Sequence, residues 1–158
     1  MIVVDTNVIG SLFLSSEHSV LAERSLQKDN EWTAPILWRS EFRNVLALYM
    51  RKNIIKLEQA QQIMNSALNL LKGREYDVPS YEVLKLASTS NCSAYDCEFI
   101  ATANDLKVAL VTVDKQLLRE FSSVAISQIR SGNSYGMMQP TMPIQRIAKS
   151  ARPLIGRD

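Results

Sequence analysis

Short apolar runs and longer amphipathic stretches alternate along this 158-residue chain. Apolar or β-branched runs at 2–4, 32–34, 76–78, 108–113 and 124–126 predict strands. Apolar residues spaced three and four apart predict helices over 19–27, 40–53, 57–71, 80–88, 93–104 and 115–121. Residues 5–7 are expected to form a loop after the first strand. Because strands and helices alternate, we expect an α/β fold with a mostly parallel central sheet flanked by helices.

Cap residues refine the two helices in the middle of the chain. Ser40 is expected to cap the first of them, and Asn53 to end it. Gly73 follows the second helix at a place where a left-handed residue is favoured. These two helices are expected to form a helical hairpin.

Residues 127–158 differ in composition from the rest of the chain. They are rich in Gly and Pro and carry five basic residues against one acid, which leaves residues 1–126 with a net charge of −2. We therefore expect residues 1–126 to form one domain and residues 127–158 to form a basic C-terminal extension. This extension could contact RNA phosphates or could be a solvated terminus.

The apolar runs also bear on location. No basic leader precedes the first run, and polar residues interrupt every run well short of the roughly 20 residues that span a membrane. We expect a cytoplasmic protein without membrane segments. Cys92 and Cys97 have no second Cys pair or His-rich stretch near them, so they are expected to be buried reduced thiols and not zinc ligands.

The chemistry available to this chain is narrow. It has neither GxxxxGK[ST] nor GxGxxG, and His18 is its single histidine. Nucleotide binding by those glycine-rich loops, a His-rich zinc site and a Ser-His-Asp triad are therefore unsupported. Acidic residues must carry any catalysis.

Four acids stand where strands end or helices begin. Asp5 and Asp114 each follow an apolar run, at the strand ends where parallel sheets bind ligands. Glu41 and Asp96 each lie at a helix start, where the helix dipole favours negative charge. Two carboxylates about 4 Å apart repel by roughly 4 kcal/mol at an effective dielectric near 20. If the four carboxylates converge, a bound cation must offset their repulsion. Oxygen ligands favour Mg²⁺ or Mn²⁺, and these ions support phosphodiester hydrolysis.

Each of these acids also has a structural interpretation. Asp5 could form an Asx turn, and Glu41 could simply complement its helix dipole. Asp96 could complete a capping box with Ser93, and Asp114 could cap the next helix. The conjunction of all four favours the metal site.

Four segments surround these acids in order: IVVDTNVI, SEFRNVLALY, AYDCEFIATA and LVTVDKQLL. They resemble the motifs of the PIN-domain family of metal-dependent ribonucleases, and within it the VapC-type toxins of toxin–antitoxin modules. The resemblance covers residues 1–126. It implies a PIN-like, Rossmann-like three-layer sandwich.

The resemblance also implies roles for individual residues. Asp5, Glu41, Asp96 and Asp114 would form a Mg²⁺ or Mn²⁺ site, and the side chains of Asn7 and Thr112 would orient Asp5 and Asp114. The implied activity is endoribonuclease cleavage of RNA, commonly tRNA or rRNA, by metal-activated water. A homodimer and a cognate antitoxin that covers the site are implied as well.

Two other function classes remain open. The chain could be a catalytically silent PIN-like module that binds RNA or protein, although such a module has no need of four repelling acids. An aspartyl-phosphate phosphatase is disfavoured, because its pattern places a second Asp where this chain has Asn7.

Several side chains near the motifs have alternative interpretations. Glu98 is expected to face solvent or to form a salt bridge. Arg39 and Arg43 could touch the substrate backbone or be ordinary surface residues. Trp32 and Trp38 could stack RNA bases, although core packing is favoured for both.

Overall fold

The computed structural model describes residues 1–127, so the predicted extension lies outside the described residues apart from Ser127. The described strands are β1 (Ile2–Val4), β2 (Trp32–Pro35), β3 (Glu75–Tyr76), β4 (Leu110–Thr112) and β5 (Ala125–Ser127). The described helices are α1 (Thr6–Phe13), α2 (Ser19–Lys28), α3 (Trp38–Arg51), α4 (Leu57–Leu70), α5 (Ser80–Ser88), α6 (Ala94–Leu106) and α7 (Lys115–Glu120).

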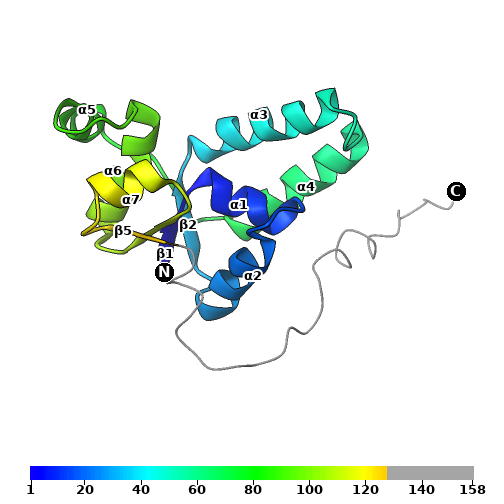
Figure 1. Ribbon diagram of the computed structural model, residues 1–158, viewed down its shortest axis with the longest axis horizontal. Coiled ribbons are helices and arrows are strands. Elements are labelled where there is room, and N and C mark those ends of the chain that lie inside the picture. The colour runs from blue at the N-terminus through cyan, green and yellow to red at the C-terminus, as the bar shows by residue number, and fades with distance from the viewer. Residues whose placement is uncertain (128–158) are drawn as a thin grey trace, which may run out of the picture.

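The strands form one sheet in the order β3-β2-β1-β4-β5, and each described pairing is parallel (Figure 1). The chain runs outward from β1 to β3 and then crosses back to β4, which pairs with the other side of β1. The direction of winding therefore reverses between β1 and β4. In open parallel sheets, ligands bind outside the carboxyl ends of the strands at such a reversal.

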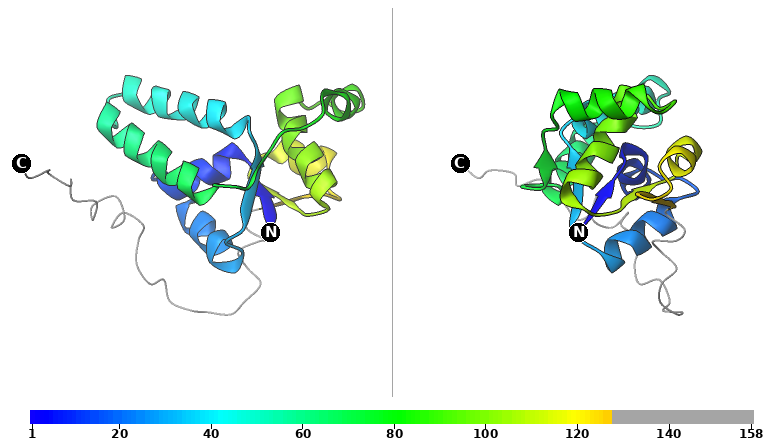
Figure 2. Two further views of the ribbon diagram at one scale, coloured as in Figure 1. Left: turned by 180° about the vertical axis from the view of Figure 1, so that it is seen from behind. Right: turned by 90° about the vertical axis from the view of Figure 1, so that its left-hand side faces the viewer.

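Helices cover the sheet on both faces, as the sequence predicted. Helices α1 to α4 pack with one another on one side, and α5 to α7 lie on the other (Figure 1). Helix α6 packs directly on β1, β2 and β4. The left view of Figure 2 shows the predicted hairpin of α3 and α4 projecting from the sheet, away from α5. This is a three-layer α/β sandwich.

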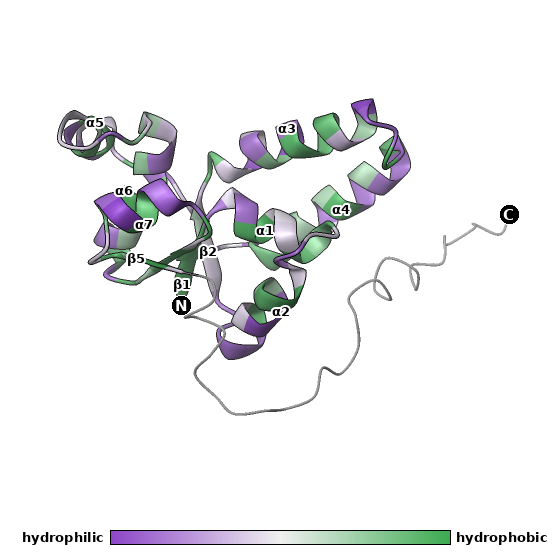
Figure 3. Ribbon diagram, viewed as in Figure 1, coloured by the Kyte–Doolittle hydropathy of each residue, from purple (hydrophilic) through white to green (hydrophobic). Residues whose placement is uncertain are grey.

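Buried apolar side chains of the two central strands form the middle of the core. Val3, Val4, Leu110 and Val111 have no exposed surface, and β1 is hydrophobic throughout, whereas α3 and α4 alternate hydrophobic and hydrophilic residues (Figure 3). This agrees with strands covered on both faces.

The tryptophans and cysteines are also in the core. Trp32 and Trp38 have no exposed surface, so base stacking by either of them is wrong and core packing is confirmed. Cys92 and Cys97 are buried free thiols, as predicted. Among residues 1–127, no helix is long and apolar enough to cross a membrane.

Two local predictions were wrong. Residues 5–7 do not form a loop, because α1 begins at Thr6 directly after β1, with Asp5 as its N-cap. Helix α3 begins at Trp38, upstream of Ser40, and its N-cap is Leu37, which makes no side-chain capping bond. The start of α3 is instead held by Glu75 of β3, whose Oε1 accepts the indole N–H of Trp38 at 2.7 Å.

Candidate active site at the carboxyl edge of the sheet

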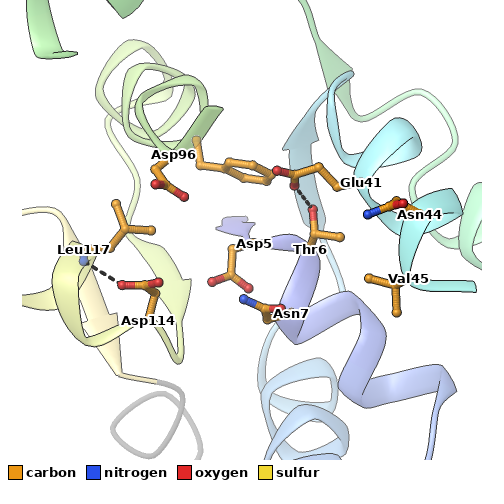
Figure 4. Close-up of a pocket in the computed structure, with 10 residues that line it drawn as sticks. Asp5, Thr6, Asn7, Glu41, Asn44, Val45, Asp96, Asp114 and Leu117 are labelled. Atoms are coloured by element: carbon orange, nitrogen blue, oxygen red, sulfur yellow. Dashed lines mark hydrogen bonds between the residues drawn. The ribbon is translucent and has the colours of Figure 1, made fainter. Parts of the chain in front are cut away.

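One cavity at the carboxyl edge of the sheet is lined by all four predicted acids. Asp5 follows β1, Glu41 lies in the first turn of α3, Asp96 lies in the first turn of α6, and Asp114 joins β4 to α7. Figure 4 shows the four side chains around one space, with Glu41 and Asp114 on opposite sides. The cavity volume is about 260 Å³, against roughly 10–15 Å³ for one water on a comparable measure. It can therefore hold ions together with part of a substrate.

Asp5 is the most enclosed of the four, with 5% of its surface exposed. Its Oδ1 accepts the backbone N–H of Val8 at 2.8 Å, and its Oδ2 accepts the hydroxyl of Thr112. Burial raises the pKa of Asp5 to about 6; hydrogen bonds oppose this shift, and the charge of Asp114 adds to it. The fold alone therefore disfavours the ionised form of Asp5, and a cation bound nearby would favour it.

Glu41 is half-buried, and its Oε2 accepts the hydroxyl of Thr6. Burial raises the pKa of Glu41, the hydrogen bond from Thr6 lowers it, and the charge of Asp96 raises it again. Its Oε1 has no hydrogen-bond partner within residues 1–127. Glu41 therefore has one oxygen held in place and one available for a ligand or a proton.

Asp96 and Asp114 each cap a helix while lining the cavity. The backbone N–H and the hydroxyl of Ser93 donate to Asp96 Oδ2 at 3.3 and 2.7 Å. Asp114 Oδ1 accepts the backbone N–H groups of Gln116 and Leu117 at 2.7 and 3.0 Å. The other oxygen of each carboxylate makes no hydrogen bond within the described chain. Capping, which the sequence left as an alternative to a site role, therefore coexists with a place on the cavity wall.

Thr112 contacts both strand-end acids through its side chain, as the resemblance implied, whereas the side chain of Asn7 contacts neither of them. The hydroxyl of Thr112 donates to Asp5 and accepts the backbone N–H of Asp114 at 2.9 Å, so it links the ends of β1 and β4. Asn7 bonds to Asp5 through its backbone and not through its side chain, because the N–H groups of the first turn of a helix point toward the N-cap carboxylate. The Asn7 side chain lines the cavity instead.

The balance of charge in the cavity fits a cation. No Lys or Arg is found among the described residues that line it, although four carboxylates are. In the arrangement seen, no three Asp, Glu, His or Cys side chains of residues 1–127 lie close enough together to hold an ion. The donors are all oxygens, which suits Mg²⁺ or Mn²⁺ in preference to softer metals.

The charged neighbours of the site lie outside the cavity. Arg39 Nε donates to Glu75 Oε1 at 2.6 Å, so Arg39 is tied to β3, and Arg43 is exposed beside Ser40. Glu98 is half-exposed and forms no ion pair within the described residues. Burial raises its pKa, and the charges of Glu41 and Asp77 raise it further. Of the two roles expected for Glu98, the salt bridge is therefore not seen within residues 1–127, and contact with solvent is partial.

Two polar residues of the cavity were not singled out from the sequence. Thr6 holds Glu41, and Asn44 lies on the wall one turn after Glu41 on α3. The three-residue spacing from Glu41 to Asn44 was a usable signal. Thr6 had no local signal, because its partner is 35 residues away in the sequence.

Comparison with known proteins supports one family. A model of the PIN domain family matches residues 2–124. A protein from Pyrobaculum aerophilum named Ribonuclease VapC3 is 29% identical over 128 residues, which cover 78% of this chain and 96% of that protein.

Two solved structures share the fold. PAE2754 from Pyrobaculum aerophilum has a TM-score of 0.62 at 20% identity and covers 82% of this chain and 95% of its own. FitAcB from Neisseria gonorrhoeae has a TM-score of 0.62 at 21% identity and covers 82% of this chain and 99% of its own. The family match over residues 2–124 shows that the chain belongs to the PIN-domain family, and the protein named Ribonuclease VapC3 is one of its sequence relatives.

Proposed function

We propose that this protein is a metal-dependent endoribonuclease and the toxin of a toxin–antitoxin pair. The observation that carries this proposal is a cavity lined by four carboxylates and, among the described residues, by no Lys or Arg. An RNA substrate would add further negative charge, so binding there requires a cation. The PIN-domain match and the relative named Ribonuclease VapC3 support RNA as the substrate class.

The metal would be Mg²⁺ or Mn²⁺, held by Asp5, Glu41, Asp96 and Asp114. When bound, such an ion neutralises charge on the phosphate and lowers the pKa of a water molecule. Asp96 and Asp114 each keep one oxygen free of the hydrogen bonds that cap their helices, so these two acids can serve the metal without releasing the helix.

The chain's own groups would position the reactants and accept a proton. Asp5 is held at both oxygens, by Val8 and Thr112, so its position is well defined. Glu41 has a raised pKa and a free Oε1. That atom can bind the metal or take a proton from the attacking water; while it is not bound to the metal, its raised pKa suits the second role, because a general base works best when its pKa approaches the working pH.

Cleavage of a mixed RNA by the purified full chain, with Mg²⁺ or Mn²⁺, tests this proposal. Asp5→Asn and Asp96→Asn should each abolish most of the cleavage. Asp105→Asn, which removes an exposed carboxylate near the end of α6, should not. Unchanged cleavage in both site variants would refute the mechanism.

Thermal unfolding separates this enzyme from a catalytically silent module. A metal that binds the native state raises the melting temperature in proportion to the logarithm of its concentration. We expect added Mn²⁺ to raise the melting temperature of the wild type more than that of Asp5→Asn. The absence of any shift at millimolar Mn²⁺ would favour the silent module.

The proposed partners are RNA in the cytoplasm, a cognate antitoxin and a second copy of this chain. Tyr81 and Leu84 on α5 and Tyr95 on α6 are exposed by 72%, 63% and 63%, and these helices pack together. Exposed apolar side chains of this size are candidates for a protein contact. The toxin role predicts growth arrest on induced expression and relief of that arrest by the adjacent gene. The dimer is tested by light scattering, in which Leu84→Glu should have a lower mass than the wild type.

A further inference from the structure

A second cavity lies beside the acid cavity at the same edge of the sheet. Its volume is about 200 Å³, and it is bounded by α1, the segment before α2, the middle of α3 and Val113. The two cavities share three wall residues, which are Thr6, Asn7 and Val45. When one unit of a polymer lies in the acid cavity, the next unit along the polymer therefore lies beside the second cavity.

The walls of the second cavity differ in chemistry from those of the first. Its described lining contains no Asp, Glu, Lys or Arg, but it does contain the aromatic rings of Tyr49 and His18 together with the hydroxyls of Ser11 and Ser16. Tyr49 is half-buried and packs against the core, so its ring is held in place. The cavity thus combines a fixed aromatic side chain with neutral hydrogen-bonding groups.

His18 is not committed to a structural role at this position. It is the N-cap residue of α2 but makes no capping hydrogen bond with its side chain. Its ring contacts the exposed Glu17 at 3.4 Å, and such exposed pairs contribute little to stability. The ring is therefore available to a ligand.

Asn7 connects the two cavities. Its side chain is exposed on the shared wall and makes no hydrogen bond within residues 1–127. A free amide offers two donors and one acceptor, which is the complement of the edge of a nucleobase. Ser11 donates to the backbone carbonyl of Asn7 at 2.8 Å, so Ser11 keeps only its acceptor capacity for a ligand.

These features select an uncharged, flat ligand group. A phosphate or a carboxylate side chain would lack a permanent cation on this wall, and a Lys or Arg side chain would lack an anion. A nucleobase has no charge, stacks on aromatic side chains and carries hydrogen-bonding groups at its edge, which is how single-stranded RNA is usually recognised.

We infer that the second cavity is a subsite for one nucleobase of the RNA, belonging to the nucleotide next to the cleaved phosphate. Tyr49 and His18 provide the stacking surface, and Asn7 hydrogen-bonds to the edge of the base. This inference rests on the proposed function and adds a specificity determinant to it: the subsite selects an unpaired nucleotide at that position.

An abasic scan of a short single-stranded RNA tests the subsite. Each nucleotide in turn loses its base, and binding to the full-length protein is measured by fluorescence anisotropy with Ca²⁺, which supplies the cation that binding requires but lacks the strict octahedral geometry of Mg²⁺; gel electrophoresis checks that the RNA stays intact. For the wild type, the abasic site at one position should weaken binding about 5- to 150-fold, the loss expected for one base–aromatic stack. His18→Ala and Tyr49→Leu should weaken binding of the intact RNA and reduce the further loss at that position.

Matched variants control for folding and for general surface effects. Tyr49→Phe keeps the ring and should retain the wild-type abasic profile. Leu57→Ala removes an exposed apolar side chain at the start of α4, outside both cavities, and should also retain it. Circular dichroism shows whether Tyr49→Leu is folded. If it is not, His18→Ala still tests RNA binding in the abasic scan, because it changes a half-exposed residue at a helix start.

The outcomes separate this inference from the proposed function. The abasic RNA is also bound to each subsite variant. If the combined loss of binding equals the product of the two separate losses, the base and the side chain share no contact, and the subsite is refuted. It is refuted equally if the variants keep the wild-type abasic profile but lose binding of the antitoxin, which would make the cavity a protein contact. Cleavage of the intact RNA with Mn²⁺ is scored separately, and a lack of cleavage with a position-specific abasic effect would refute only the nuclease.

Discussion

The two pairs of carboxylates in the acid cavity are held by the fold in opposite ways. Asp5 and Glu41 are buried or half-buried, each accepts a threonine hydroxyl, and burial raises the pKa of both. Asp96 and Asp114 stand at the starts of α6 and α7, where helix N-terminal groups donate to them. Burial opposes the charged form of a carboxyl group, whereas a helix N-terminus favours it. Burial of the first pair should therefore make the stability of the protein depend on pH, whereas removal of a cap contact in the second pair should weaken its helix.

The largest expected effect is one in which the two pairs behave alike. Glu41→Gln from the first pair and Asp114→Asn from the second should each lower RNA cleavage about 1,000-fold, beyond the 10- to 100-fold typical of groups outside the metal's own ligands. Asn also caps helices well, so Asp114→Asn isolates the loss of charge. Initial rates at saturating Mn²⁺ give the comparison. A loss in only one variant would show that one pair does not serve the reaction.

A second effect separates the pairs by pH. The pKa of Asp5 is about 6 in the folded chain against 3.8 as a reference, so the folded state binds this proton more tightly than the unfolded state. Without metal, the stabilisation from this group is fully present below pH 4 and is lost as the pH rises through 6. A difference of about two pKa units corresponds to about 3 kcal/mol.

Urea unfolding in EDTA at pH 4 and pH 7 measures this effect. Other groups titrate in the same range, so the quantity of interest is the difference between the wild type and Asp5→Asn. The variant should lose about 3 kcal/mol less than the wild type between the two pH values. Added Mn²⁺ at pH 7 should stabilise the wild type and restore much of the difference. Identical pH profiles for the wild type and Asp5→Asn would show that the fold does not raise the pKa of Asp5.

The strand-end acids show what the sequence could predict. Contiguous apolar runs identify β1 and β4, and residues after parallel strands meet at one edge of a sheet, so Asp5 and Asp114 were expected close together. Helix-start signals placed Asp96 correctly after Ser93, in a capping box. These predictions succeeded because each depends on a local pattern and a general rule of sheet geometry.

The contacts that tune the acids could not be predicted in the same way. Thr112 and Asp5 are 107 residues apart, and Thr6 and Glu41 are 35 residues apart, so no local pattern pairs them. The helix after Asp5 was missed because Asp-Thr-Asn suits a turn as well as an N-cap. The missed helix matters for the site, since it places the hydroxyl of Thr6 beside Glu41.

Thr112→Val should have an intermediate effect, which acts on the carboxylate of Asp5 in the first pair and also removes a contact to the backbone of Asp114. The change removes the hydroxyl that donates to Asp5 and accepts the N–H of Asp114, so we expect a loss of about 1–3 kcal/mol of stability. Because that hydrogen bond lowers the pKa of Asp5, the variant should raise this pKa further, and cleavage should fall about 10- to 100-fold.

Thr102→Val provides the matched control for Thr112→Val. Thr102 is 2% exposed, and its hydroxyl donates to the backbone carbonyl of Glu98 at 2.8 Å within α6. The control should leave cleavage unchanged and lose less stability, because a helix carbonyl keeps its backbone partner. Equal losses of activity in both variants would show that Thr112 acts only through general packing.

The smallest expected effect concerns the second pair and comes from Ser93→Ala. This change removes the cap of α6 and the hydroxyl that donates to Asp96 at 2.7 Å, so stability should fall by about 1 kcal/mol. The loss should be the same with and without Mn²⁺, because Asp96 keeps its carboxylate and its place in the first turn. Cleavage should fall less than tenfold.

Ser66→Ala, which changes an exposed serine of α4, controls for loss of a hydroxyl from a helix. If Ser93→Ala instead reduced cleavage as much as Thr112→Val and made stability depend on metal, the helix-start acids would be tuned by their hydrogen bonds just as the buried acids are, and the contrast between the two pairs would fail.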